Sequence, residues 1–135
     1  MENMGLELLF KGNNFLRLWG GLWITLRIAL ISMLFSMILG FFLGIIMRIK
    51  NPVLKVICRI YLEIVRIMPQ LVLLFLVYFG AAKHLGVNMS GEGAAVLVFT
   101  FWGTAEMGDL VRSALGAIPK HQYESGYGLG LTKWQ

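Results

Sequence analysis

The sequence predicts an all-α integral membrane protein with three transmembrane helices, followed by a short cytoplasmic helix. The main observation is composition: 58% of the 135 residues are hydrophobic and only 14% are charged. A soluble domain averages about 25% charged residues, so the polar residues here are too few to cover a globule of this size. A lipid bilayer requires no such cover, and long uncharged runs separate the charged residues.

The composition also argues against several classes of function. The net charge is +5, but the basic residues cluster beside apolar runs, which is typical of membrane orientation rather than of nucleic-acid binding. The single cysteine, Cys58, excludes an intramolecular disulfide. The sequence contains no phosphate-binding loop, catalytic triad or metal-ligand spacing. We therefore expect a membrane protein that is not an enzyme and that uses no cofactor, metal or nucleic-acid partner.

The first span is expected at about residues 22–47, because residues 28–47 carry no charge and are long enough to cross the hydrocarbon. Within it, small residues recur at every fourth position: Ser32, Ser36, Gly40 and Gly44. Such a stripe lets a second helix approach closely, so we interpret it as a packing surface rather than a substrate contact. Residues 1–19 are expected to form an extracytoplasmic leader that lies along the membrane interface.

The second span is expected at about residues 60–82. Glu63 and Arg66 stand at its entrance, three residues apart, and can pair on one helix face. Pro69 lies inside the span and predicts a kink or break near Arg66. The sequence leaves open whether this kink is merely tolerated or serves as a hinge in a transport pathway.

The third span, at about residues 93–115, is interrupted by charges. Glu106, Asp109 and Arg112 follow one another at three-residue steps, and the last two can neutralise each other as an ion pair. Carboxylates at membrane depth are costly unless they face protein or water. Either this end of the helix is enclosed in such surroundings, or it has already reached the membrane interface.

The basic residues predict the orientation of the chain. The connection between the first two spans holds four basic residues and no acidic one: Arg48, Lys50, Lys55 and Arg59. The segment after the third span is also basic. The positive-inside rule therefore places the first connection and the C-terminus in the cytoplasm and the N-terminus outside. The expected location is the cytoplasmic membrane of a cell, crossed several times.

A cytoplasmic helix is expected at residues 119–130. Pro119 suits the start of a helix, and Gly130 suits the position just past its end. Tyr123, Tyr127 and Leu131 are spaced by four and form one apolar ridge. A helix this short is marginal alone and needs a groove, either on its own bundle or on a partner.

At this point the sequence resembles the permeases of ABC-type importers for polar amino acids, which have the MetI-like, type I importer fold. Residues 66–72, Arg-Ile-Met-Pro-Gln-Leu-Val, resemble the Arg-x-x-Pro segment of their second core helix. Residues 124–130, Glu-Ser-Gly-Tyr-Gly-Leu-Gly, resemble their cytoplasmic EAA loop, and residues 109–124 resemble the segment that leads into it. Ser125 and Gly126 replace the alanine pair of that motif, and His121 replaces the usual glycine.

The resemblance implies an incomplete permease domain over residues 20–135, because the family continues with further spans after the EAA loop. It implies a cytoplasmic ATPase, a second permease and an extracellular amino-acid-binding protein as partners. It also implies a coupling role for eight residues of the loop. These are Pro119, Gln122, Tyr123, Glu124, Ser125, Gly126, Tyr127 and Gly130.

Two other functions remain open from the sequence. The chain could be a truncated, non-transporting membrane protein that binds the ATPase or inhibits assembly of the permease. It could also be a small channel that assembles from copies of itself through the stripe from Ser32 to Gly44.

Overall fold

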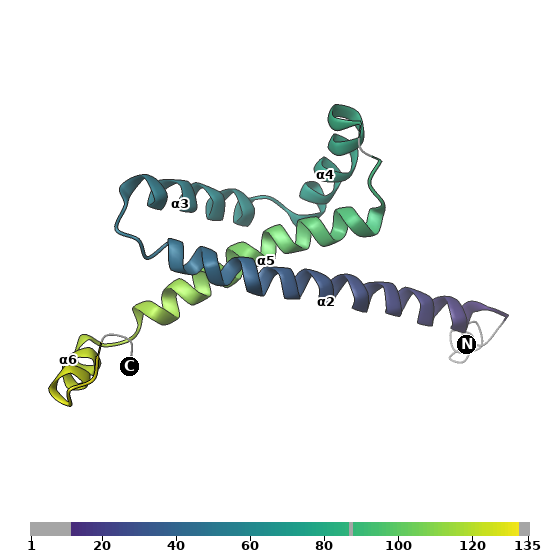
Figure 1. Ribbon diagram of the computed structural model, residues 1–135. Coiled ribbons are helices and arrows are strands. Elements are labelled where there is room, and N and C mark those ends of the chain that lie inside the picture. Colours follow the sequence, from purple (N-terminus) through teal and green to yellow (C-terminus); the bar gives the residue numbers. More distant parts are fainter. Residues whose placement is uncertain (1–11, 87, 133–135) are drawn as a thin grey trace, which may run out of the picture.

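The computed structural model describes residues 12–86 and 88–132, which form helices joined by short connections and contain no strand (Figure 1). Most of the expected leader, residues 1–11, lies outside the described residues, as do residues 133–135. The helices in chain order are α2 (Asn14–Ile46), α3 (Pro52–Ile67), α4 (Gln70–Leu85), α5 (Gly91–Gly116) and α6 (Lys120–Gly128).

Two of these helices, α2 and α5, are individually long and apolar enough to cross a membrane. They contain nearly all of the expected first and third spans. However, α2 begins at Asn14 and is continuous, so the end of the expected leader is part of the same helix as the span. Many large apolar side chains on α2 stay exposed, for example Leu34 at 58% and Phe42 at 59%, which suits a surface that faces lipid.

The expected second span is broken, and its first half starts earlier than residue 60. Pro69 lacks a backbone donor, and the residue before a proline avoids the helical region, so Met68 is extended with φ −80° and ψ 123°. The helix therefore ends at Ile67 and resumes as α4, bent by 102°. The kink expected near Arg66 is confirmed, but α3 and α4 together count as one span only if the bent pair is taken as a broken span.

The ends of the helices follow from local capping. Asn51 precedes α3 and accepts a hydrogen bond from the backbone N–H of Val53 at 2.9 Å, while Pro52 occupies the first helical position. Ser90 caps α5 by accepting from the N–H of Gly93 at 3.1 Å. These caps fix where each helix starts after a short connection, and they explain why α3 begins at Pro52.

The most extensive contact in the molecule joins α2 to α5. The four buried residues of α2 are Ser32, Ser36, Gly40 and Gly44, the small residues that the sequence predicted to pack against another helix. A Cβ atom on Gly40 would lie 2.5 Å from Cβ of Met107, and one on Gly44 would lie 2.8 Å from the carbonyl oxygen of Gly108. Only glycine permits so close an approach of the two backbones.

The contact also satisfies polar groups on the stripe. The hydroxyl of Ser32 donates to the carbonyl oxygen of Val96 at 3.4 Å, and that of Ser36 donates to the carbonyl oxygen of Thr100 at 3.3 Å. Because each serine finds an acceptor on α5, its burial does not leave an unpaired hydroxyl in an apolar setting.

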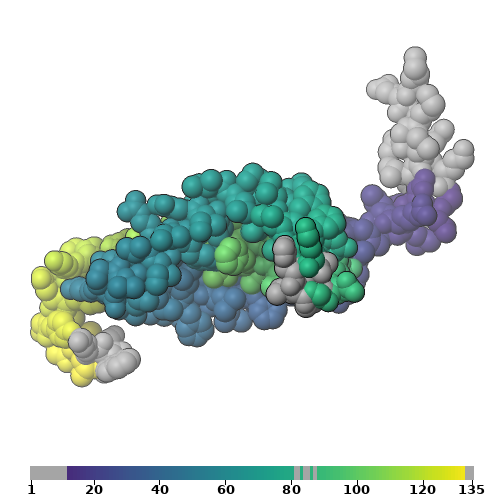
Figure 2. All heavy atoms as spheres, turned by 90° about the horizontal axis from the view of Figure 1, so that it is seen from above, coloured from purple at the N-terminus to yellow at the C-terminus, as the bar shows by residue number. Residues whose placement is uncertain are grey.

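The helices form an elongated bundle rather than a sphere. α3 runs alongside the crossing pair α2 and α5, while α4 starts in contact with α5 and then projects away from the pair (Figure 1). α6 lies at the opposite end of the molecule from the start of α2, as both views show (Figures 1 and 2). The short segment between Gly116 and Lys120 is what joins α6 to the rest of the bundle.

The close approach of α2 and α5 generates a prediction about two glycines of the same helix. Gly44→Ala should destabilise the protein by about 1–3 kcal/mol, because the new methyl group would overlap the backbone of Gly108. Gly20→Ala is the matched control, since a Cβ there meets nothing within 4 Å and alanine improves helix propensity. Unfolding of the detergent-solubilised protein, followed by circular dichroism, measures both. Equal stability of the two variants would contradict the packing.

Candidate functional site

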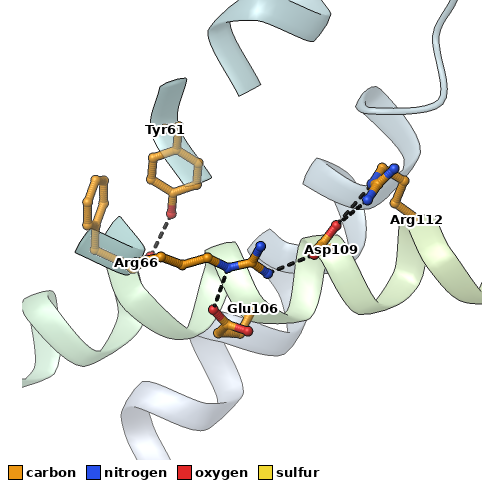
Figure 3. A network of polar contacts seen from close by, with 6 residues as sticks. Tyr61, Arg66, Glu106, Asp109 and Arg112 are labelled. Carbon is orange, nitrogen blue, oxygen red and sulfur yellow. Dashed lines mark hydrogen bonds and ion pairs between the residues drawn. The ribbon is translucent and has the colours of Figure 1, made fainter. Parts of the chain in front are cut away.

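The break after Ile67 places Arg66 in the last turn of α3, beside α5 (Figure 3). Its guanidinium donates from Nε to Oε1 of Glu106 at 3.1 Å, and from a terminal nitrogen to Oδ2 of Asp109 at 2.7 Å. Both acceptors are on α5, about forty residues further along the chain. Arg66 therefore ties the broken region to the helix that leads to α6.

Asp109 is the centre of this cluster. Arg112 donates to its Oδ1 from Nε at 3.0 Å and from a terminal nitrogen at 2.6 Å, while Arg66 occupies Oδ2. The side chain of Asp109 is 20% exposed, the least of the four. Two carboxylates and two guanidinium groups balance in charge, so the cluster avoids leaving an uncompensated ion among apolar helices.

A second contact lies one helical turn earlier on α3. The hydroxyl of Tyr61 donates to the carbonyl oxygen of Phe101 at 2.6 Å, and the two rings meet edge to face with centroids 4.8 Å apart. Together with Arg66, this contact holds the second half of α3 against α5 (Figure 3). A hollow of about 520 Å³ opens beside the cluster, lined by the charged groups of Arg66, Glu106 and Asp109 and by apolar side chains such as Met107 and Leu110.

The structure brings together some of the residues that the sequence singled out and separates others. Arg66 and the pair Asp109–Arg112 form one cluster, beside the break at Pro69. The expected pairing of Glu63 with Arg66 is wrong: Glu63 accepts from Arg59 at 2.9 Å, one turn back on the exposed side of α3. The reason is that Arg66 has two carboxylates on α5 within reach.

Sequence reasoning missed Tyr61 and the partner of Glu106. The contacts of Tyr61 with Phe101 and of Arg66 with Glu106 each join residues forty positions apart, so local spacing does not predict them. The one available signal was the charge count in each helix: α3 carries three basic residues and one acidic residue, whereas α5 carries three carboxylates and one arginine.

The helix expected at residues 119–130 is present as α6, which has Pro119 as its N-terminal flanking residue and ends at Gly128. Gly130 has φ +78°, a left-handed conformation that favours glycine, and the N–H of Leu131 returns to the carbonyl oxygen of Gly126 at 3.0 Å. The chain is therefore turned back at the position where the sequence predicted a stop.

None of the nine residues of α6 is buried. Tyr123 is 54% exposed and Tyr127 is 56% exposed, so the aromatic ridge is not covered by the part of the chain that the structure describes. Gln122, Glu124 and Ser125 are exposed as well. Of the two grooves that the sequence left open for this helix, the described bundle does not supply one.

The ion-pair cluster generates a prediction about energetic coupling across two helices. A double-mutant cycle of Arg66→Gln and Asp109→Asn should give a coupling energy of about 1–3 kcal/mol, because charged hydrogen bonds between them are lost only once. The control cycle combines Arg59→Gln with Asp109→Asn. In the described part of the chain the guanidinium of Arg59 pairs with Glu63, so this cycle should give no coupling. Denaturant unfolding monitored by tryptophan fluorescence measures both, and zero coupling for Arg66 would refute the cluster.

Comparison with known protein families gives one extended match. Residues 36–135 match the model of the family described as binding-protein-dependent transport system inner membrane component. This range includes the small-residue stripe from Ser36 onward, the break at Pro69, the ion-pair cluster and α6.

Individual relatives agree with the family match. The chain is 31% identical over 118 residues to "Probable glutamine ABC transporter permease protein GlnP" of Bacillus subtilis, covering 87% of this chain and 54% of that protein. It is 35% identical over 77 residues to "Probable amino-acid ABC transporter permease protein YckA" of the same species, covering 57% of this chain and 34% of that protein. The chain thus spans about half or less of the length of these relatives.

A solved structure shares the fold. The crystal structure of an amino acid ABC transporter with histidines superposes with a TM-score of 0.70 at 25% identity, covering 81% of this chain and 50% of the other. Family match, relatives and fold agree with the permease features described above. The chain therefore belongs to the family of binding-protein-dependent transport system inner membrane components.

Proposed function

We propose that this chain is the permease component of an ATP-driven amino-acid importer and that it docks to a cytoplasmic ATPase through α6. The observation that carries the proposal is the state of α6: a short helix with an exposed aromatic ridge, held away from the bundle. An isolated helix of nine residues is marginally stable in water, so a groove on a partner would stabilise it.

In this proposal the residues of α6 contribute to docking in different ways. Tyr123 and Tyr127 fill an apolar groove with their rings, and Glu124 supplies the charged contact. Gly126 carries no side chain that would hold the partner away, and Gly130 turns the chain back. Pro119 starts the helix, while Gln122 and Ser125 offer hydrogen bonds from its exposed surface.

Movement of the ATPase would reach the membrane through α5. This helix is continuous from Gly91 to Gly116, and the short connection after it keeps α6 close to its end. Arg66 joins α5 to the last turn of α3, next to the break at Pro69. A displacement of α6 would therefore act on a position where two helices already meet at 102° and where Pro69 has no backbone N–H to donate to a helical hydrogen bond.

The proposed importer also requires a defined orientation of the chain in the membrane and further protein subunits. The basic residues in the connection between α2 and α3, Arg48 and Lys50, support a cytoplasmic position for α6 and an outside position for the start of α2. A second permease, identical or homologous, would complete the passage, and an extracellular binding protein would deliver the substrate. The names of the relatives support amino acids as the substrate class.

The charge at Glu124 provides the test. In cells whose amino-acid uptake depends on the transporter, Glu124→Arg should lower uptake at least tenfold while the protein still inserts into the membrane, because the docking contact becomes repulsive. Co-purification of the ATPase should fall in parallel. The control is Lys83→Glu, which reverses an exposed charge on α4, far from α6, and should leave both measurements unchanged.

The outcomes separate the proposal from its rivals. Normal uptake and normal ATPase recovery in Glu124→Arg would sink the docking role. ATPase binding without any uptake by the wild-type protein would favour a non-transporting protein that occupies the ATPase. Conductance of purified protein in liposomes without ATP would favour a self-assembled channel.

A further inference from the structure

The charged residues of α3 form a single line along the helix. Lys55, Arg59, Glu63 and Arg66 follow at steps of four, four and three residues, so they share one face, which we call the charged ridge. The buried residues Cys58 and Val65 lie on a second face, against α5. A third face carries apolar residues that stay exposed: Val53, Val56, Ile57, Ile60, Ile64 and Ile67.

The position of α3 makes this ridge costly in lipid. α3 runs alongside α2 and α5, the two helices that are long and apolar enough to span a membrane (Figures 1 and 2). Tyr61 and Arg66 bind its second half to α5 within residues 101–109. A charged side chain at the centre of a bilayer costs about 3 kcal/mol on insertion scales, so a helix at this depth would not present four of them to hydrocarbon.

The ridge is also not covered by protein in the described bundle. The exposed fraction of the side chain falls along it from 81% at Arg59 to 58% at Glu63 and 45% at Arg66. At Arg66 the ridge meets the hollow of about 520 Å³ that Glu106 and Asp109 also line. Charged groups of both signs thus form a continuous surface from the start of α3 to the middle of the molecule.

We infer that the charged ridge faces water and lines the passage through which the solute moves, leading to the hollow beside Arg66. The inference rests on the proposed transport function and adds Lys55, Arg59 and Glu63 to the surfaces that serve it. A passage with both signs of charge suits a solute that carries both signs itself. The apolar face with Ile60 and Ile64 is left for lipid.

The test compares neighbouring positions on the two exposed faces. Single cysteines are placed on the ridge (Arg59→Cys or Glu63→Cys) and on the apolar face (Ile60→Cys or Ile64→Cys), all in a Cys58→Ser background. The side chains at 60 and 64 are about half exposed in the chain, 52% and 49%, so exposure by itself does not separate the faces. The complete transporter, with its ATPase and its second permease, is labelled in native membranes with a membrane-impermeant, positively charged methanethiosulfonate.

The two ridge positions should react at least tenfold faster than the two apolar positions. Labelling after SDS denaturation gives the total thiol for each variant. The two positions on each face keep the test decisive if one substitution loosens the helix, because a thiol in hydrocarbon stays protonated and reacts slowly at either apolar position. Slow reaction at all four positions would overturn the inference, because the ridge would then be covered. Fast reaction at all four would also overturn it, because α3 would lie in water.

Failure of the ridge and failure of the transport proposal are distinguishable. Uptake and ATPase recovery are measured for the Cys58→Ser background in the same membranes. Normal uptake without the contrast between faces overturns only the ridge. The contrast without uptake or ATPase recovery supports a ridge that faces water and overturns the transport proposal on which the passage rests.

Discussion

The close contact between α2 and α5 is the interaction on which the other parts depend. In lipid, the hydrophobic effect does not drive helices together, so association rests on packing and on polar contacts. Gly40 and Gly44 bring the backbones together, and Ser32 and Ser36 add hydrogen bonds across the same interface. α5 then serves as the platform for the rest: α3 is fixed to one side of it, and α6 continues from its end.

A second constraint, the cost of charge at membrane depth, decides how α3 is attached. Arg66, Glu106, Asp109 and Arg112 neutralise one another across two helices. The cluster forms just before Pro69 interrupts the helix, so a charged contact between α3 and α5 lies next to the break in the backbone. The ion pairs hold the end of α3 against α5. The helix beyond the break, α4, makes fewer contacts with α5 than α2 does.

The sequence predicted what depends on local pattern. The fourfold spacing of small residues identified the buried stripe of α2, Pro69 located the break, and Gly130 located the end of α6. It did not predict the 102° direction after Pro69, because a proline removes a hydrogen bond without specifying where the chain goes next. It paired Glu63 with Arg66, the nearest candidate, whereas the partners of Arg66 lie on α5, about forty residues further along the chain, where local spacing gives no information.

Two surfaces that the described part of the chain leaves uncovered, α6 and the charged ridge of α3, differ in the surroundings that would stabilise them. α6 offers aromatic rings at the tip of the molecule, where contact with another protein removes apolar area from water and supplies the tertiary support that a short helix lacks. The charged ridge of α3 places charged side chains beside helices that face lipid. Contact with an apolar partner would raise the free-energy cost of these charges, and contact with water lowers it. In the proposed importer, α5 connects the two surfaces: α6 follows its C-terminal end, and α3 is attached to it through Arg66. Contact of a protein with α6 and contact of the solute with the charged ridge would therefore both act on α5.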